Sequence, residues 1–498
     1  MSELNLKGIN ALRQNIDPLI KVGDIVGSTI GPQGKDVEII NKVGKTIFSN
    51  DGATVLKNIN IDDPIISKCL IHSATNQEKQ AGDGTSTMVL YASELSANGY
   101  NLNFRYNIDP VVISKGYKLA LDKSIEILNK YSIPLKYKDI KNIVKTTFTG
   151  KSLENYEFIH DLCIKAVKEA NLDLSNIIIK GIMGDLNKTK SIRGIALDCS
   201  LAHNNMPKSI KNPKILILDA EVGEQVLRAN SHININNIEE LTALQDRDSI
   251  ISEKFTKQIK ALGVDILICQ RDISDFAIEY LNKAKIVAVR NINDKETIEQ
   301  IARALECNIV KDIKNISKED LGTADNYKYS NLTDEGYLIF EKAKSEVQTI
   351  LVYGSNEMSI DEYKRAIDDA IGTIKTILEH KTYVLGAGNI EIRIAEELRA
   401  YSKTLNDGLL EASVNGFADS IEIVPIRLAI SAGMHPLKAL NKLRKNKLFG
   451  VNVHSGEIER TNKVIEPTYT KQCALTNACE VVINNVLRIG YIIEGRNE

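Results

Sequence analysis

The sequence predicts a mixed α and α/β fold in which two helical regions flank an α/β region. Apolar residues recur at helical spacing up to Lys130 and again from about residue 360. Between them, three short runs rich in Ile, Leu and Val alternate with helical patterns. This alternation is typical of an α/β unit with at least partly parallel strand pairing. A helical region that resumes after such an insert suggests a discontinuous outer domain.

Length and charge exclude several classes of protein. The 498 residues suffice for about two to four domains. Lys plus Arg (63) nearly balances Asp plus Glu (65), so no basic field indicates a nucleic-acid partner. No apolar run approaches the length of a membrane span, and the first thirty residues lack the apolar core of a secretory signal. We therefore expect a cytoplasmic chain with neither a nucleic-acid nor a membrane partner.

The spacing of the cysteines and histidines predicts no metal centre formed by these residues. The seven cysteines form no CxxC pair, so reduced thiols are expected. HExxH is absent, and no histidine spacing favours structural zinc.

The first helical region can be divided by its caps and glycines. Asp63 followed by Pro64 is the pattern of an N-cap with proline at the first helical position. The expected elements are a helix over 11–30 stopped by GPQG (31–34), a hairpin over 37–51 with its turn near 41–44, a short helix after Asp51, a helix from Pro64 to the glycines at 82 and 84, and a helix from Pro110 to Lys130.

The middle and last regions follow the same reasoning. Strands are expected over 213–222, 263–270 and 284–292, and helices over 246–262, 274–283 and 294–306. Later, 361–378 has a helical pattern with Asp368 and Asp369 near its apolar side, and the pattern alone favours a solvated edge for them.

Three glycine-containing turns predict an anion site. Asp83 lies between two glycines, and Thr85, Ser86 and Thr87 follow at the start of a helix. A second acidic turn surrounds Asp51, and a third turn is TIGPQGKD (29–36). Each lies at a helix boundary, where unpaired amides and the helix dipole favour an anion. The turns could converge on one polyphosphate, with the two aspartates binding Mg²⁺ or orienting water. The alternative for GDGT is a plain turn with a Ser/Thr cap.

A rival motif lies at TYVLGAGNIEIRIAEEL (382–398). Its order of strand, GxG and helix is similar to a dinucleotide fingerprint, but Glu391 stands where the third glycine belongs. It also comes late in the chain. A glycine turn that closes over a different nucleotide is therefore favoured.

Taken together, the motifs resemble the group II chaperonins, and specifically subunits of the eukaryotic cytosolic chaperonin (TRiC/CCT). The resemblance covers essentially the whole chain. It is carried by TIGPQGKD, SNDGATVLKNI, QEKQAGDGTSTMVL, KRAIDDAI, GAGNIEIRIAEEL, FADSIEIVPIRLAISAG and GVNVHSGEI, in the family's order. The phrases IEELTALQD, RAIDDAI and ALTNACEVVINNVLRI are most similar to the theta subunit.

The resemblance implies a three-domain subunit. An equatorial ATP-binding domain would comprise 1–136 and 388–498, an intermediate domain 137–202 and 350–387, and an apical α/β domain 203–349. A helical protrusion that acts as a built-in lid would fall near 230–256.

The resemblance also implies roles for individual residues. Asp83 would bind Mg²⁺, Asp51 would lie beside the γ-phosphate, and Asp369 would orient the attacking water. The implied nucleotide contacts are Gly31 and Pro32 in the first turn, Gly84, Thr85, Ser86 and Thr87 in the phosphate loop, Gly150 and Lys151 in the loop that senses the γ-phosphate, Gly386, Ala387 and Gly388 in a glycine turn, and Glu466 and Lys471 at the nucleoside.

Several residues depart from the family pattern. Ser86 replaces a usual threonine but keeps the hydroxyl, Gln80 replaces a common acidic residue, and Ala387 interrupts a usual triple glycine. The turn residues Lys35, Val37 and Glu38 also differ. We expect nucleotide binding to be kept, with a hydrolysis rate that the sequence does not determine.

The resemblance implies a subunit of a double-ring ATPase that encloses and folds client proteins. It would use ATP/ADP and Mg²⁺, assemble with paralogous subunits in a hetero-oligomeric ring, and fold clients such as cytoskeletal proteins. Two alternatives stay open: a nucleotide-binding ring member with weak hydrolysis and a mainly structural role, and a stand-alone metabolic ATPase or kinase, for which no substrate motif is seen.

Overall fold

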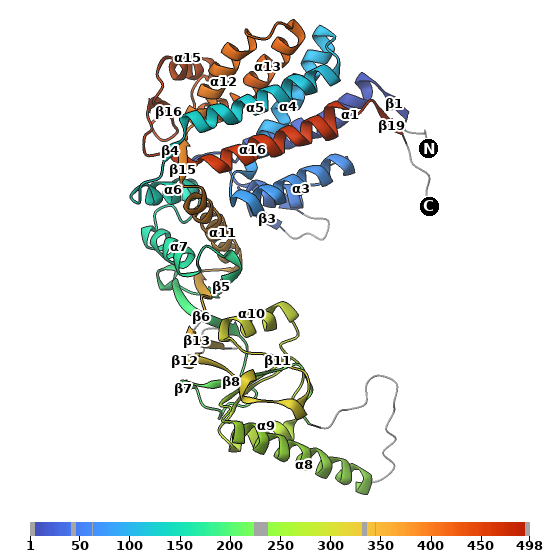
Figure 1. The fold of residues 1–498 in the computed structure, drawn as a ribbon, viewed down its shortest axis with the longest axis vertical. Helices are drawn as coiled ribbons and strands as arrows, with labels where there is room; N and C mark the ends of the chain where they lie inside the picture. Colours follow the sequence, from blue (N-terminus) through green and yellow to red (C-terminus); the bar gives the residue numbers. More distant parts are fainter. Residues whose placement is uncertain are drawn as a thin grey trace. The chain divides into compact units, whose positions relative to one another are not determined.

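The computed structural model describes residues 5–40, 46–61, 63–223, 238–330, 336–343 and 345–493. The chain divides into two compact units (Figure 1). Unit 1 comprises Met1–Ile164 and Arg365–Glu498, and unit 2 comprises Lys165–Lys364. Unit 1 is thus built from both ends of the chain. The boundaries of the three domains that the resemblance implies stay a prediction.

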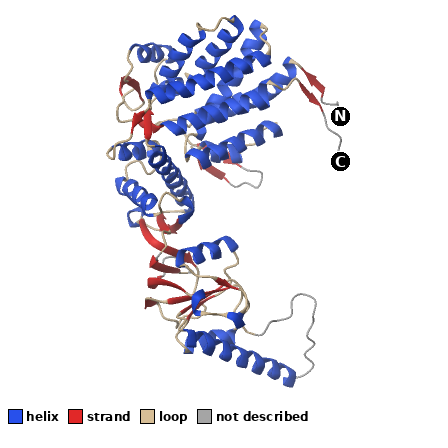
Figure 2. Cartoon of the chain, in the orientation of Figure 1, coloured by secondary structure: helices blue, strands red, loops and turns tan. Residues whose placement is uncertain are grey.

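Unit 1 is mainly helical (Figure 2). Its helices are α1 (Ile9–Gly27), α2 (Gly52–Asn58), α3 (Pro64–Ala81), α4 (Thr85–Tyr106), α5 (Pro110–Tyr131), α6 (Asp139–Phe148), α12 (Asn389–Ser402), α13 (Gly408–Ile421), α14 (Ile423–Ser431), α15 (Pro436–Lys445) and α16 (Thr468–Val481). The helices α7 (Glu157–Glu169) and α11 (Glu357–His380) each begin in one unit and end in the other.

Helix α4 forms the centre of this unit. It packs against α1, α13 and α16, and Met88, Val89 and Leu95 are fully buried on it. A helix that is apolar on most of its circumference is typical of the middle of a core. The GDGTST turn at its N-terminus is therefore attached to a helix that is packed on several sides.

The predicted caps are confirmed. The Asp63 carboxylate accepts hydrogen bonds from the amides of Ile65 and Ile66, at 2.8 and 2.9 Å, and Pro64 is the first residue of α3. The expected hairpin is formed by β2 (Val37–Ile40) and β3 (Thr46–Ser49), which pair antiparallel. Its predicted turn near 41–44 lies outside the described residues.

Small sheets complete unit 1. Strand β1 (Asn5–Lys7) pairs with β19 (Tyr491–Ile493), and β16 (Phe449–Asn452) pairs with β17 (Glu457–Arg460). Strand β15 (Thr382–Leu385) pairs antiparallel with both β18 (Ile465–Pro467) and β4 (Ile133–Pro134). A dinucleotide-binding βαβ unit needs parallel strands, so the GAG turn after β15 does not belong to one.

Unit 2 is built on one mixed sheet with the strand order β10-β9-β8-β12-β13-β6-β14-β5, to which β11 and β7 add at β8 and β12. The strands are β5 (Ile177–Met183), β6 (Lys190–Asp198), β7 (Ser209–Lys211), β8 (Lys214–Leu218), β9 (Ile266–Cys269), β10 (Val287–Val289), β11 (Ile309–Val310), β12 (Gly322–Ser330), β13 (Tyr337–Ala343) and β14 (Gln348–Gly354). The predicted strands β8, β9 and β10 pair parallel, and all residues of β9 are fully buried.

The helices predicted in this unit are present as α8 (Ile238–Leu262), α9 (Asp275–Lys283) and α10 (Lys295–Leu305). Of the expected lid segment near 230–256, residues 230–237 lie outside the described residues and the rest belongs to α8. On the described part of α8, Ile250 is 67% exposed.

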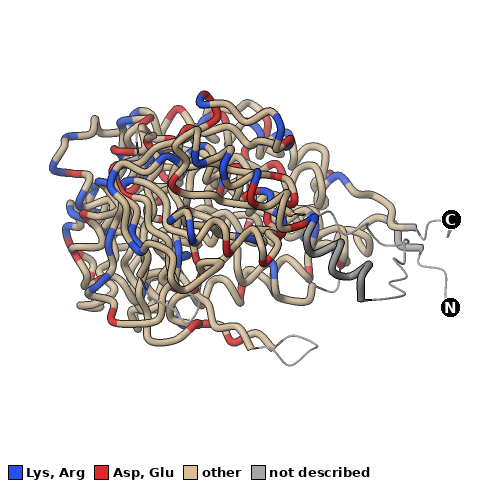
Figure 3. Tube along the Cα trace, turned by 90° about the horizontal axis from the view of Figure 1, so that it is seen from below, with Lys and Arg blue, Asp and Glu red and all other residues tan. Residues whose placement is uncertain are grey.

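Charge and hydropathy agree with the composition. Basic and acidic residues are interspersed along the described trace (Figure 3). Within that part of the chain, no helix combines the length and the apolar character needed to span a bilayer.

Candidate functional site

The turn that carries Asp83 depends on glycine. Gly82 ends α3 and Gly84 precedes α4, with φ angles of 69° and 90°. These angles are in the left-handed region, which favours glycine. The Gly84 amide donates a hydrogen bond to Asp83 Oδ1 at 2.6 Å. The turn therefore holds a carboxylate directly beside the N-terminus of α4, where Thr85, Ser86 and Thr87 begin the helix.

Helix α11 lies against this turn. A Cβ atom added to Gly82 would be only 2.3 Å from the carbonyl carbon of Gly372. The Thr376 hydroxyl donates a hydrogen bond to the Ala81 carbonyl at 3.1 Å. This close approach brings Asp369, one turn before Gly372 on α11, to the side of the turn that carries Asp83. The sequence motifs did not include Gly372, although a glycine inside an otherwise good helix was a visible signal.

Asp369 forms an ion pair with Lys151. The pKa of Asp369 is raised to about 7, mainly by burial. The Lys151 ammonium lowers this pKa, whereas the Asp51 and Asp83 carboxylates raise it further. The solvated edge that the helix pattern favoured for Asp369 is therefore wrong, whereas its neighbour Asp368 is exposed.

The same carboxylates also shift the pKa of Lys151. Burial by itself lowers the pKa of Lys151, but the carboxylates of Asp369 and Asp83 more than offset this effect, and the pKa is raised. Lys151 is thus a firmly protonated cation among several carboxylates.

Asp51 is the N-cap of α2. Its Oδ2 accepts a hydrogen bond from the Thr54 amide at 2.7 Å. Gly52 lies against the start of α4, because a Cβ atom there would be 2.6 Å from Ser86 Oγ. The acidic turn at 51 and the turn at 84–87 are therefore in direct contact, as the convergence hypothesis requires.

The first glycine turn joins the same place. Gly31 has a φ angle of 83°, and its carbonyl accepts a hydrogen bond from the Gly34 amide at 2.9 Å. A Cβ atom on Gly150 would be 2.8 Å from the Gly31 carbonyl oxygen and 3.2 Å from Pro32 Cα. The Asn50 side chain donates a hydrogen bond to the Gly150 carbonyl at 3.2 Å. The loop at Gly150 thus bridges the turns at 31 and 51.

A buried ion triad lies on another side of the Asp83 turn. Lys471 Nζ is 2.8 Å from Glu391 Oε1 and 2.7 Å from Glu466 Oε2. The side chains of Lys471 and Glu391 are nearly inaccessible, whereas 26% of the Glu466 side chain is exposed. The Lys471 ammonium is thus directed at two carboxylates, and Glu466 is the member of the triad that solvent and ligands can reach.

The pKa values in this triad reflect burial. Burial raises the pKa of Glu466, with Lys471 acting in the opposite direction and the Glu391 and Asp83 carboxylates adding to the rise. Tyr91 of α4 donates a hydrogen bond to Glu391 at 3.2 Å. The role of Glu391 as the buried partner of Lys471 was missed by sequence reasoning, which noted it only as a replacement for glycine.

The GAG turn contacts the triad. A Cβ atom on Gly386 would be 2.5 Å from Glu466 Oε1. Ala387 adopts a φ angle of 57°, a conformation that costs an L-residue about 1 kcal/mol or more. Its carbonyl accepts a hydrogen bond from the Val451 amide at 2.9 Å. Gly388, with a φ angle of 78°, then starts α12.

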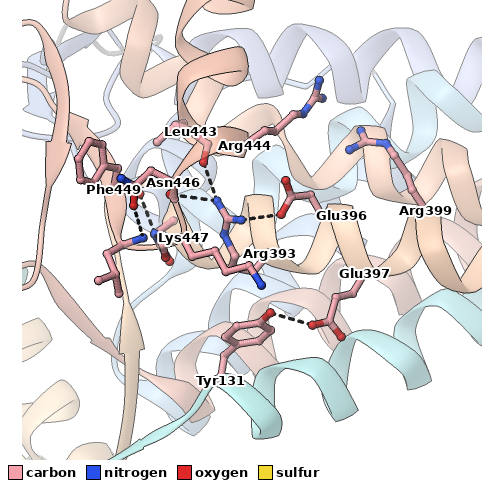
Figure 4. A network of polar contacts seen from close by, with 12 residues as sticks. Tyr131, Arg393, Glu396, Glu397, Arg399, Leu443, Arg444, Asn446, Lys447 and Phe449 are labelled. Atoms are coloured by element: carbon pink, nitrogen blue, oxygen red, sulfur yellow. Dashed lines mark hydrogen bonds and ion pairs between the residues drawn. The ribbon is translucent and has the colours of Figure 1, made fainter.

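A polar network fixes the start of α12 behind this turn (Figure 4). The Arg393 guanidinium donates hydrogen bonds to the carbonyl of Leu443 at 2.6 Å and to Glu396 at 2.5 Å. The Asn389 side chain donates a hydrogen bond to the Phe449 carbonyl at 2.6 Å. Because Arg393 is only 2% exposed, this network is a rigid support and not a solvated contact.

Gln77 connects the two sides of the site and was also missed by sequence reasoning. Its Nε2 donates hydrogen bonds to the carbonyls of Asp83 and Thr470, at 2.8 and 3.3 Å. The Asn477 side chain donates to Gln77 Oε1 at 2.9 Å. Gln77 is fully buried and links the Asp83 turn to α16, which carries Lys471.

The arrangement suits a polyphosphate with a divalent cation. All of these residues belong to unit 1. Among the described residues, no group of three or more His, Cys, Asp or Glu side chains could hold a metal ion by itself. Mg²⁺ normally takes one or two carboxylates and completes its shell with phosphate oxygens and water. Asp83 fits that requirement as a single ligand beside helix-start amides.

Comparison with known proteins assigns the class. The TCP-1/cpn60 chaperonin family model matches residues 22–497. The chain therefore belongs to the TCP-1/cpn60 chaperonin family and has the mixed α/β fold of a chaperonin subunit.

The similar proteins narrow the class to group II chaperonins. The chain is 33% identical to thermosome subunit alpha of Archaeoglobus fulgidus, over 98% of this chain and 93% of the relative. It is 33% identical to a thermosome subunit of Pyrococcus horikoshii, over 98% of this chain and 91% of the relative. Thermosome subunit beta of Archaeoglobus fulgidus is 32% identical, with 98% and 93% covered. These relatives do not single out the eukaryotic theta subunit.

Proposed function

We propose that this chain is an ATP-hydrolysing subunit of a double-ring chaperonin that encloses client proteins. The observation that carries the proposal is the ion pair of Lys151 and Asp369 beside the Asp83 turn. The pair would supply an acid and a base to phosphates bound at the start of α4, since helix N-termini favour anions. The family membership supports a chaperonin as the machine that this hydrolysis would drive.

The phosphates of ATP would lie on the helix-start amides and hydroxyls of 84–87 and against the turn at Gly31 and Pro32. Asp83 would hold Mg²⁺ on the phosphate oxygens, and the ion would neutralise charge that develops during phosphoryl transfer. Asp51 would face the terminal phosphate in this arrangement. Gly386–Gly388 and Glu466 would close over the nucleoside side, with Lys471 holding the Glu466 carboxylate.

Asp369 would orient the attacking water and accept its proton as water attacks the γ-phosphorus and ADP leaves. A pKa of about 7 suits a general base that works near neutral pH. Lys151 must then exchange its carboxylate partner for the γ-phosphate, which frees Asp369 for the water. The exchange makes hydrolysis dependent on the placement of α11 and couples ATP turnover to closure of the subunit.

We further propose a cytoplasmic, hetero-oligomeric ring with paralogous subunits, in the manner of the eukaryotic cytosolic chaperonin and most similar to its theta subunit. The sequence phrases quoted above support the finer assignment. The thermosome relatives of Archaeoglobus fulgidus, named alpha and beta, support a ring of related subunits. Clients would be unfolded proteins such as cytoskeletal proteins.

Two measurements test the proposal. Electron microscopy and sizing of the native particle should show a double ring that contains related subunits. Mg²⁺-dependent ATP turnover of that particle should fall when Asp83 is replaced. A free monomer that phosphorylates or converts a small molecule would support a metabolic ATPase or kinase instead.

A second function is favoured by one observation. Ala387 holds a strained conformation where the family has glycine, and it stands at the nucleotide turn. A ring member that binds nucleotide but hydrolyses it weakly is therefore the alternative. Single-subunit Asp369 variants in the assembled ring distinguish the two, because only a hydrolysing subunit loses turnover at its own site.

A further inference from the structure

The loop that carries Lys151 is attached to α7 by one imidazole. His160 is only 5% exposed. Its ring stacks on Phe148, with centroids 4.5 Å apart and an interplanar angle of 7°. Its Nε2 lies 3.2 Å from the Leu153 carbonyl oxygen. Phe148 precedes Lys151 and Leu153 follows it, so a single side chain contacts both ends of the short segment that presents the lysine.

Other hydrogen bonds also shape the loop. The Leu153 carbonyl accepts a second hydrogen bond, from the Tyr156 amide at 3.1 Å. The Lys151 amide donates to the Phe148 carbonyl at 3.0 Å, and the Glu154 amide donates to the Lys151 carbonyl at 3.0 Å. The Gly150 amide donates to Glu154 Oε2 at 3.0 Å. These bonds are local turns, whereas His160 ties the loop to the helix behind it and Asn50 ties it to the turn in front.

The chemistry of the contact assigns the protonation of His160. A carbonyl oxygen only accepts hydrogen bonds, so Nε2 carries a proton and donates a hydrogen bond to the Leu153 carbonyl. Burial lowers the pKa of His160, while the Leu153 carbonyl acts in the opposite direction. The charged neighbours are Glu157 and Asp161 of α7 and Lys145 of α6. The imidazole is therefore neutral at pH 7, with Nδ1 unprotonated.

We propose that His160 is a positioning residue that sets Lys151 against Asp369. This inference rests on the proposed function, because Lys151 matters for turnover only if the site hydrolyses ATP. The stack on Phe148 orients the ring, and the bond to Leu153 fixes the far end of the loop. Loss of the bond lets the loop drift, and a displacement of about 1 Å of a catalytic group can cost up to about 100-fold in rate.

Two substitutions separate the stack from the hydrogen bond. His160→Phe keeps an aromatic ring on Phe148 and removes the donor. His160→Gln keeps a donor that can take the place of Nε2 and loses the ring. Tyr117→Phe is the matched control, since it deletes a buried hydrogen bond to the Leu95 carbonyl, 2.9 Å long, elsewhere in unit 1.

ATP turnover of the assembled particle should discriminate the variants. His160→Phe should lower kcat by about tenfold with KM for MgATP changed less than about twofold, because Lys151 acts on nucleotide already bound. His160→Gln and Tyr117→Phe should stay within about twofold of wild type. Wild-type kcat in His160→Phe, or an equal loss in His160→Gln, would overturn the proposal.

Hydrogen exchange without nucleotide gives a readout that does not require hydrolysis. Segment 148–154 should lose protection in His160→Phe and keep it in His160→Gln and Tyr117→Phe. If the three variants show this pattern of protection but the wild-type particle does not hydrolyse ATP, the proposed function fails and the positioning role stands. Unchanged protection in His160→Phe would contradict the positioning role itself.

A pH series covers the case in which His160→Phe does not assemble. The series is run on Asp369→Asn, because Asp369, whose pKa is raised to about 7, pairs with Lys151 in the same segment. Protonation of His160 would bury a positive charge, so segment 148–154 of Asp369→Asn should lose protection, corrected for intrinsic exchange, as the pH falls below 7. The double variant Asp369→Asn/His160→Gln should lack this change. The same pH dependence in both proteins would refute the role of His160.

Discussion

The backbones of Gly82 and Gly372 touch: a Cβ atom on Gly372 would lie 2.6 Å from Gly82 Cα. This contact joins the turn that holds Asp83 to the helix that carries Asp369. Two carboxylates from distant parts of the sequence reach one site because neither glycine has a side chain.

Gly372→Ala should therefore destabilise the protein and reduce ATP turnover. Alanine favours a helix by up to about 1 kcal/mol over glycine, but overpacking against a backbone costs about 1–3 kcal/mol. Thermal unfolding and turnover measure both effects. Gly408→Ala, at a helical glycine with nothing near its Cβ position, is the control and should be neutral or stabilising. A stabilised and fully active Gly372→Ala would show that the two helices separate without consequence.

Asp83→Ala should weaken Mg²⁺-dependent ATP binding by about tenfold or more, since a charge-assisted contact contributes about 1.5–3 kcal/mol. Labelled-nucleotide binding with and without Mg²⁺ checks this. Asp109→Ala, which removes the N-cap of α5, is the matched control and should bind nucleotide normally. Equal Mg²⁺ dependence in wild type and Asp83→Ala would remove Asp83 from the metal site.

Asp369→Asn should keep ATP binding and slow single-site hydrolysis by about 100-fold, as expected for loss of a general base. The pH profile gives an independent check. The pKa of Asp369 is raised to about 7, so the carboxyl is protonated, and cannot accept a proton, as pH falls below that value. Wild-type turnover should thus decline below about pH 7, and the residual rate of Asp369→Asn should lack this decline. Normal turnover at saturating ATP would refute the role.

Ala387→Gly should tighten nucleotide binding. Glycine relieves the strain of the left-handed backbone, worth about 1 kcal/mol, which stabilises the fold. Nucleotide binding should tighten because the substitution also removes a methyl group from the turn proposed to contact the nucleotide. The matched control is Ala432→Gly at the end of α14, where φ is −80° and no such strain exists. Equal or weaker nucleotide affinity in Ala387→Gly would mean that the alanine does not restrict the turn.

The segment near 230–256 should gain protection from hydrogen exchange when a transition-state analogue of ATP hydrolysis is bound. Its sequence is amphipathic, with apolar residues such as Leu241 and Ile251 between charged ones, so it can pack against neighbours and still stay soluble when they separate. Equal protection with and without the analogue would identify ordinary apical surface.

The sequence by itself determined the local elements, because their causes are local. Asp63 caps the start of α3, and Pro64 has the fixed φ angle that suits the first helical position. Both effects act between adjacent residues. Apart from the exposed Lys214, the residues of β8, β9 and β10 are apolar and fully buried, as is typical of parallel strands covered on both faces. The glycines at 31, 82 and 84 predicted turns because residues other than glycine rarely adopt φ angles in the left-handed region.

Only the tertiary structure decided which turns meet and what each polar residue faces. The helix pattern placed Asp369 on a solvated edge, because periodicity describes a helix and not its neighbours; Lys151 lies across from it. Glu391 and Lys471 stand on different helices and pair only where α12 and α16 approach. Gln77 begins the motif QEKQAGDGTSTMVL, which assigns it no role, and His160 belongs to no motif. The roles of both come from the carbonyls that folding brings within hydrogen-bond distance. Such contacts depend on the packing of segments far apart in the chain, which no local rule encodes.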